Sequence, residues 1–297
     1  MARTRFRRDR GLSWRMGSVG LGLGALYVAF GVVLIYFSGS AILGLVIVLG
    51  MAWGQWFFSD SLALKSMGAK VVSPQQAPEL HAMIDRLVAL ADMPKPRVAI
   101  AQTDVPNAFA TGRTPNHSAV CVTTGILNRL DADELEGVLA HELAHVANRD
   151  VSVMTVASSL GLLAGFMTRW GMFFGGGGRN RNSGPAFLVV FLVSMIVYFV
   201  SFLLTRALSR YRELSADRSG AYLTGRPSKL ASALTKISGD MARIPTKDLR
   251  EVESMNAFFI APALNRQSIE AVMSTHPPLD RRLAQLAQIS ADLSERG

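Results

Sequence analysis

The stretch "HELAHVANRD" at residues 141–150 places two histidines four positions apart, with a glutamate directly after the first. Ten residues upstream, Asp131 and Glu134 have the spacing of a capping box, which marks the start of a helix. On a helix, positions i and i+4 lie on one face. His141 and His145 would therefore direct both rings to one point, with Glu142 beside them.

This pattern favours a zinc site. Neutral imidazoles are good ligands for Zn²⁺, and a glutamate at this position can bind the water of the metal rather than the metal itself. The alternative is an ordinary solvated helix face, because two histidines and a glutamate also meet by chance on charged helices. The motif alone favours zinc over this alternative, and a third ligand would strengthen it.

A candidate third ligand lies in "RYRELSADRSG" at residues 210–220. Catalytic zinc keeps three protein ligands and one open position. Glu213 can bind the metal, and Asp217, one turn later on the same face, can accept the ring N–H of His141. Gly220 lies near that face and would let the two helices approach closely.

Two alternatives compete with this third ligand. The charges of residues 210–220 could form a solvated face flanked by arginines. A three-histidine site would instead need one of the remaining histidines, none of which has a supporting spacing: His81, His117 and His276. His81 lies on a predicted amphipathic helix and is expected to be a lone surface histidine.

Hydropathy predicts a multi-pass membrane protein. The chain has 297 residues, of which 49% are hydrophobic, and no charged residue lies between Met16 and Ser59. A bilayer span needs roughly 20 apolar residues. The block therefore fits two spans, about 16–37 and 41–58, and a second apolar block at 151–205 fits two more.

The basic N-terminus predicts the orientation. Six arginines precede the first span, and such clusters stay on the cytoplasmic side of a cell inner membrane. The polar segments would then be cytoplasmic as well. Although the net charge is +9, its position favours anionic lipid headgroups over nucleic acid as the partner. The predicted parts are a basic N-terminus (1–15), a hairpin (16–58), a first catalytic part (59–150), a second hairpin (151–207) and a second catalytic part (208–297).

The polar segments predict a mostly α fold with a small β-sheet. "RVAIAQ" (97–102) and "SAVCVTTGIL" (118–127) are typical of strands. Cys121, the only cysteine, excludes an intrachain disulfide and is expected to be a buried strand residue. Further helices are predicted at 77–92, 205–225 with Gly225 as its stop, 228–242 and 276–293.

Four stretches carry a family resemblance: "PNAFATGR" (106–113), "GVLAHELAHVANRD" (137–150), "SRYRELSADRSG" (209–220) and "STHPPLDRRL" (274–283). With them, the chain resembles the HtpX-type membrane zinc metalloproteases, which are related to the CAAX prenyl proteases. The resemblance covers the N-terminal hairpin and most of the chain after about Lys70. It implies a zincin-like α+β catalytic domain, one Zn²⁺ per subunit held by His141, His145 and Glu213, and Glu142 as general base.

The resemblance also suggests how a substrate lies in the site. "PNAFATGR" would supply an edge strand with which an extended peptide pairs, and Asn107 and Ala108 are the candidate substrate-binding residues. The alternative is a plain loop anchored by Phe109. His276 could stabilise the oxyanion, or it could be a helix-start histidine bonded to the backbone.

The expected function is a membrane-anchored zinc endopeptidase that hydrolyses misfolded or damaged membrane proteins on the cytosolic side, in quality control and stress response. One alternative is an intramembrane site-2-type protease, but burying the charges around "HELAH" in lipid would be costly. The other is a non-enzymatic scaffold or transporter component. Transporters need ionisable residues inside their spans, and the first two predicted spans have none.

Overall fold

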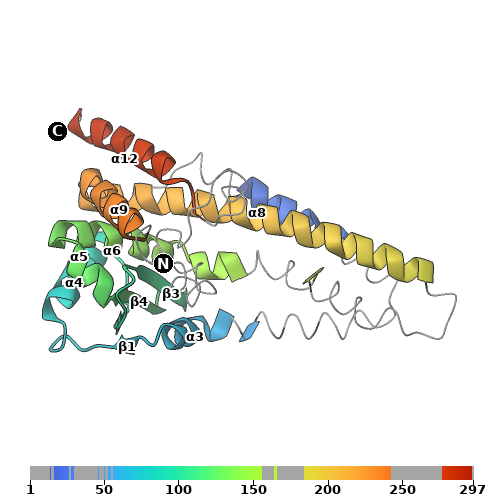
Figure 1. The fold of residues 1–297 in the computed structure, drawn as a ribbon, viewed down its shortest axis with the longest axis horizontal. Helices are drawn as coiled ribbons and strands as arrows, with labels where there is room; N and C mark the ends of the chain where they lie inside the picture. Colours follow the sequence, from blue (N-terminus) through green and yellow to red (C-terminus); the bar gives the residue numbers. More distant parts are fainter. Residues whose placement is uncertain are drawn as a thin grey trace.

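The computed structural model describes residues 14, 17–26, 28–29, 46, 50, 53–54, 56–155, 164–165, 184–241 and 276–295. Most of the first three predicted spans lies outside these residues, so the multi-pass arrangement stays a prediction. Figure 1 shows a small sheet with helices around it at one end of the long helix α8. The fold is mostly helical, as predicted.

The sheet has four strands in the order β1-β2-β4-β3 within the described part of the chain. β2 and β4 are parallel, and the two outer pairs are antiparallel. β3 therefore forms one edge of the sheet. The strands are β1 (Lys70–Val71), β2 (Arg97–Ala101), β3 (Ala108–Thr114) and β4 (His117–Thr123).

The predicted strand at 118–127 is too long. β4 ends at Thr123, whose side chain accepts a hydrogen bond from the N–H of Ile126 and caps helix α5 (Thr124–Arg129). A threonine that caps a helix offers the backbone an alternative to the sheet ladder. Cys121 lies in β4 and is fully buried, as predicted.

Helix α6 (Ala132–Ala147) is the centre of the domain. Its capping box between Asp131 and Glu134 is formed as predicted. Every residue from 134 to 144 is buried. A helix buried on all sides must pair its polar side chains, because an unpaired buried charge is costly. The polar residues of α6 therefore depend on the neighbouring elements for partners.

Apolar faces of the surrounding helices complete the core. Ile84, Leu139, Leu230 and Leu286 are almost fully buried, and each comes from a different helix. Besides α6, these helices are α4 (Pro78–Ala91), α9 (Pro227–Met241) and α12 (Leu279–Ser294), and α3 (Ser59–Ser66) packs beside β3. The predicted helices at 77–92, 228–242 and 276–293 are thus confirmed, with small shifts at their ends.

The prediction for His81 is wrong. This histidine is buried, with 7% of its surface exposed. Its Nε2 lies 3.1 Å from the carbonyl oxygen of Val72 and can donate to it. The segment that follows β1 thus covers a face of α4 that the sequence pattern alone predicts to be solvated.

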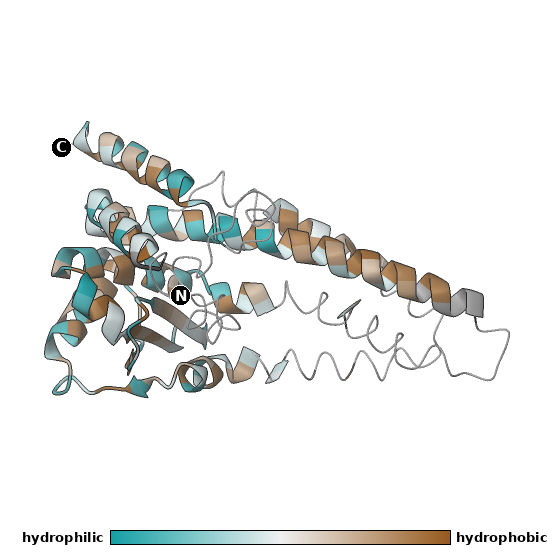
Figure 2. Cartoon of the chain, viewed as in Figure 1, coloured by the Kyte–Doolittle hydropathy of each residue, from teal (hydrophilic) through white to brown (hydrophobic). Residues whose placement is uncertain are grey.

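Helix α8 (Gly184–Thr224) has 41 residues, which makes it about 60 Å long. Among the described residues, the stretch Phe191–Thr224 is the one helix long and apolar enough to cross a membrane. Its apolar half extends away from the sheet in Figure 2, and several large side chains on it are exposed, as lipid-facing residues would be: Leu188, Leu192, Ile196 and Phe199.

The polar half of the same helix enters the domain. The predicted fourth span and the predicted polar helix are therefore one continuous rod, which ends before Gly225. That glycine has a φ of 67°, as a helix stop requires. Leu23, in the apolar helix Gly17–Leu26 of the first predicted span, packs against Leu208 of α8.

Candidate metal centre

Helices α6 and α8 touch at Gly220. A Cβ atom there would lie 2.9 Å from the backbone nitrogen of His141 and 3.1 Å from the carbonyl carbon of Ala140. No other residue type fits this contact without moving a backbone, which agrees with the close approach predicted from the sequence. The contact brings the "HELAH" turn of α6 against the turns of α8 that carry Glu213 and Asp217.

Three side chains converge beside this contact. Ligand atoms of His141, His145 and Glu213 all lie within 4.8 Å of one another. The two Nε2 atoms are 3.2 Å apart. The carboxylate of Glu213 lies 3.5 Å from Nε2 of His141 and 3.4 Å from Nε2 of His145. His141 is 1% exposed and Glu213 is 7% exposed, so this is an interior cluster rather than a solvated face.

The outer nitrogen of His141 faces a carboxylate. Its Nδ1 lies 2.9 Å from Oδ1 of Asp217, at the position predicted from the sequence. Asp217 in turn accepts two hydrogen bonds from the guanidinium of Arg282, at 2.6 and 2.7 Å. Both residues are almost completely buried. The ion pair between α8 and α12 therefore holds the carboxylate that orients the first histidine ring.

His145 has an equivalent arrangement that sequence reasoning missed. Its Nδ1 lies 2.5 Å from Oδ2 of Asp150, and Nε of Arg212 lies 2.9 Å from the other oxygen of that carboxylate. A general rule points to Asp150: a metal-binding histidine gives its second N–H to a nearby carboxylate or carbonyl. No comparable signal in the sequence pairs Arg212 with Asp150 or Arg282 with Asp217.

The donor set fits a divalent cation. Carboxylates beside both Nδ1 atoms place the ring protons there, which leaves each Nε2 with a lone pair. Two such lone pairs 3.2 Å apart, next to a carboxylate, repel one another. A cation between them removes this repulsion, and two imidazoles with one carboxylate suit zinc.

The electrostatics of the site are consistent with cation binding. Burial lowers the pKa of His145, but the carboxylates of Glu213 and Asp150 outweigh burial and raise the pKa to about 10. Burial also lowers the pKa of His141, and Asp217 and Glu213 reverse the effect, so the net shift is upward. The surrounding negative charge that stabilises a proton on these rings also stabilises a metal ion, which would displace that proton.

Glu142 faces the edge strand. Its Oε2 accepts a hydrogen bond of 2.8 Å from the backbone N–H of Ala110 in β3. Burial raises the pKa of this carboxyl, although His141 and His145 oppose the shift. No pattern in the sequence indicates the contact with Ala110. This hydrogen bond brings the candidate general base next to the strand predicted to bind substrate.

His276 lies at the same cluster, three residues before α12. It is 5% exposed, and its Nδ1 is 3.1 Å from Oε2 of Glu213. The structure therefore places His276 beside the candidate third ligand. Only the tertiary structure brings His276 to this site, because its position in the sequence has no regular spacing from His141 and His145.

The two candidate substrate-binding residues lie at the start of β3. The backbone N–H of Asn107 donates to Oγ1 of Thr123, and the carbonyl of Asn107 accepts from the N–H of Thr123. Ala108 is the first residue of β3, two positions from the Ala110 contact with Glu142. In a strand, two positions span about 7 Å.

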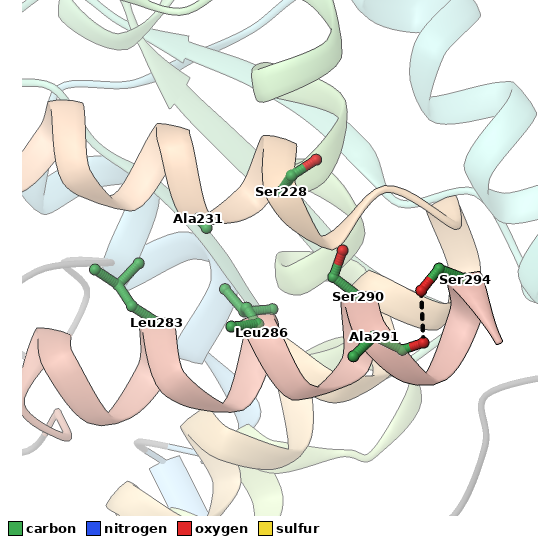
Figure 3. A pocket seen from close by; sticks show the side chains of 8 residues that line it. Ser228, Ala231, Leu283, Leu286, Ser290, Ala291 and Ser294 are labelled. Atoms are coloured by element: carbon green, nitrogen blue, oxygen red, sulfur yellow. Dashed lines mark hydrogen bonds between the residues drawn. The ribbon is translucent and has the colours of Figure 1, made fainter.

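A groove between α9 and α12 is separate from this cluster (Figure 3). Its lining residues are small or apolar and include no acid, base or metal ligand: Ser228, Ala231, Leu283, Leu286, Ala287, Ser290, Ala291 and Ser294. The groove therefore has no side chain that could bind a metal ion or activate a water molecule or a serine for hydrolysis.

Known proteins are similar to this chain in sequence and in fold. A protease HtpX homolog of Moorella thermoacetica is 53% identical over 293 residues, covering 97% of each chain. A protease HtpX homolog of Pyrococcus furiosus is 39% identical and covers 95% of this chain and 98% of the relative. The crystal structure of S. mikatae Ste24p has a TM-score of 0.56 at 17% identity, over 94% of this chain and 67% of that one, and shows a related fold.

The profile of peptidase family M48 matches residues 74–290, which include α6, the polar half of α8 and His276. Together with the near full-length HtpX homologs, this match covers every stretch that carried the resemblance in the sequence. The chain therefore belongs to peptidase family M48, among its HtpX-type members, and it is a metalloprotease that hydrolyses peptide bonds.

Proposed function

We propose that the chain is a membrane-anchored zinc endopeptidase in which His141, His145 and Glu213 hold one Zn²⁺ ion. The observation that carries the proposal is the convergence of these three donors within 4.8 Å in the interior. Asp217 and Asp150 support it, because they fix the orientation of both imidazole rings. The catalytic domain is assembled from residues 59–150 and 208–297, on either side of the hairpin at 151–207.

The ion would polarise the scissile carbonyl and lower the pKa of its water. Glu142 takes a proton from the attacking water and later gives it to the leaving amine. A buried carboxyl with a raised pKa is suited to holding that proton between the two steps. The Ala110 N–H fixes one carboxylate oxygen of Glu142. His276, beside Glu213, can donate an N–H to the developing oxyanion.

Substrates are misfolded or damaged membrane proteins, cleaved on the cytosolic side. An extended segment pairs with β3, beginning near Asn107 and Ala108. The continuity of α8 supports this substrate class, because one helix joins an apolar stretch to the residues of the site. The arginine-rich N-terminus supports a cytoplasmic orientation in the inner membrane.

The environment of α6 disfavours an intramembrane protease. Glu134 binds Lys236 and Ser232, and Glu136 forms an ion pair with Arg86. These partners belong to the polar domain, where water can solvate the outer charges. A helix with this many charged neighbours would be unstable in lipid.

The test combines zinc analysis with cleavage of a tagged membrane substrate, using the wild-type chain and Glu142→Gln. The variant should retain one zinc per chain, because Glu142 is not a proposed ligand, while the rate falls by roughly 10²–10⁴-fold. Cleavage at the wild-type rate would show that Glu142 is not the base. A wild-type protein without stoichiometric zinc would refute the metal assignment.

A further inference from the structure

The C-terminal end of β3 is hydrogen-bonded to residues that border the predicted membrane spans. Nη1 of Arg113 donates to the carbonyl of Phe57 at 3.0 Å, and the guanidinium lies 4.3 Å from the centre of the Phe57 ring. The hydroxyl of Ser152 donates to the carbonyl of Arg113, and Nε1 of Trp56 donates to that hydroxyl, both at 2.8 Å. We call these four residues the β3 clasp.

The β3 clasp lies at the level where α8 changes from apolar to polar. Met154, two residues after Ser152, packs against the buried cluster that contains Leu208 of α8, and Leu204 packs against the same cluster. The first arginine of α8, Arg206, lies between those two leucines. Tryptophan and phenylalanine side chains beside the β3 clasp are also exposed, as is common at a membrane interface: Trp53 and Phe58.

The opposite end of β3 is fixed on the far side of the site. The backbone N–H of Asn107 donates a hydrogen bond to the side chain of Thr123, which caps the short helix α5. From there the strand passes Glu142 at Ala110 and reaches the β3 clasp at Arg113. β3 therefore runs from the interior of the domain toward the membrane.

The hydrogen-bond pattern between β3 and β4 shows which backbone groups of β3 point away from β4, toward the place proposed for a substrate. Asn107 and Thr123 are opposite one another and hydrogen-bonded, and the register pairs Ala108 with Val122. Because bonded and non-bonded pairs alternate in an antiparallel ladder, Ala108, Ala110 and Gly112 direct their N–H and C=O groups away from β4. The bond from Ala110 to Glu142 agrees with this parity.

We propose that the enzyme cleaves cytosolic segments that follow a membrane span in the chain direction, and that it takes them with the N-terminal flank toward the bilayer. The inference rests on the proposed role of β3 as the substrate strand. Antiparallel pairing is the more stable ladder. Since β3 runs toward the membrane, a peptide paired with it in this way runs away from the membrane.

The geometry also predicts how many residues separate the membrane span of a substrate from its cleavage site. Ala110 and Arg113 are three positions apart, which corresponds to about 10 Å of strand. A segment that follows a span reaches Glu142 after roughly three to five extended residues. A segment that precedes a span approaches the bilayer with its C-terminal flank. It must therefore leave the site, turn and come back, which needs a longer linker.

The test uses the full chain in lipid nanodiscs with two single-span substrates. A peptide of about ten residues, enough to cover β3, is first selected from a soluble library because the wild type cleaves it and Glu142→Gln does not. The same peptide is then joined to one apolar span by roughly five flexible residues, either after the span or before it. The total length and the composition of both substrates are matched.

The substrate with the peptide after the span should be cleaved at least about tenfold faster, because its short linker gives it a high effective concentration in the correct direction. Lengthening the linker to about 30 residues should restore cleavage of the other substrate. Equal rates with the short linkers, or faster cleavage of the peptide before the span, would overturn the inference and leave the proposed function intact. If no soluble peptide is cleaved, both fail.

Discussion

Replacing Gly220 with alanine should weaken zinc binding. Gly220 is the point where α8 meets the backbone of α6, at His141. The two helices carry different proposed ligands, since α6 contains both histidines and α8 contains Glu213. A change in their separation therefore alters the distances among the proposed ligands directly.

The magnitude follows from the contact. The new Cβ would lie 2.9 Å from the backbone nitrogen of His141, whereas ordinary contacts begin at 3.4 Å. The helices must separate by about 0.5 Å, at a cost of roughly 1–3 kcal/mol for overpacking. Metal–ligand distances tolerate only about 0.2 Å. The Kd for zinc should therefore rise by at least about tenfold, comparable to the loss of an outer partner of a ligand.

The assay is chelator competition for zinc on the full-length protein in detergent, with Tm measured in parallel. Two glycine variants are matched controls. Gly137→Ala crowds Leu230 of α9 at 3.2 Å, and α9 carries no proposed ligand, so Tm should fall while zinc affinity stays unchanged. A Cβ atom added at Gly239 would have no neighbour within 4 Å, so Gly239→Ala should leave zinc binding unchanged and raise Tm slightly.

Two results would refute this reasoning. Gly220→Ala with wild-type zinc affinity would show that the helix separation does not control the ligand set. An equal rise of the Kd for zinc in Gly137→Ala would show that the overall stability of the domain, rather than the α6–α8 contact, determines metal binding.

Three further outcomes are expected. Glu213→Ala should lower the zinc content measured by metal analysis, and an unchanged stoichiometry would remove Glu213 from the site. Asp150→Asn should raise the Kd for zinc about 10–100-fold in the chelator assay, because the His145 ring loses its orienting carboxylate; unchanged affinity would contradict that role. The third outcome concerns the pKa of the Glu134 carboxyl. Burial raises this pKa, but hydrogen bonds from Lys236, a serine hydroxyl and a backbone N–H outweigh burial and lower the pKa below the ordinary 4.5. A lowered pKa in the folded state stabilises the protein above pH 4.5, and this contribution is lost as the pH falls through the lowered pKa. The Tm difference between the wild type and Glu134→Gln should therefore shrink below about pH 4.5, and a constant difference down to pH 3 would refute it.

Features that depend on local geometry could be predicted from the residues alone. Helical periodicity put His141 and His145 on one face, and the Asp131 and Glu134 spacing marked the start of α6. The glycines were also informative, because Gly220 has a packing role and Gly225 has a positive φ that few other residues adopt. The length of the second apolar block also predicted the one helix among the described residues that is long enough to cross a membrane, because bilayer thickness fixes the length of such a helix, while the other spans stay a prediction.

The distant groups that surround the site became known only from the folded chain. Arg282 reaches Asp217 across 65 positions, and Ala110 reaches Glu142 across 32. Such pairs leave no periodic signal, because either partner could be an ordinary surface or strand residue on its own. The burial of His81 escaped prediction for the same reason, since the segment that covers it has no regular pattern. The direction of β3 relative to α8 also depends on the way separate elements pack, which local spacing does not encode.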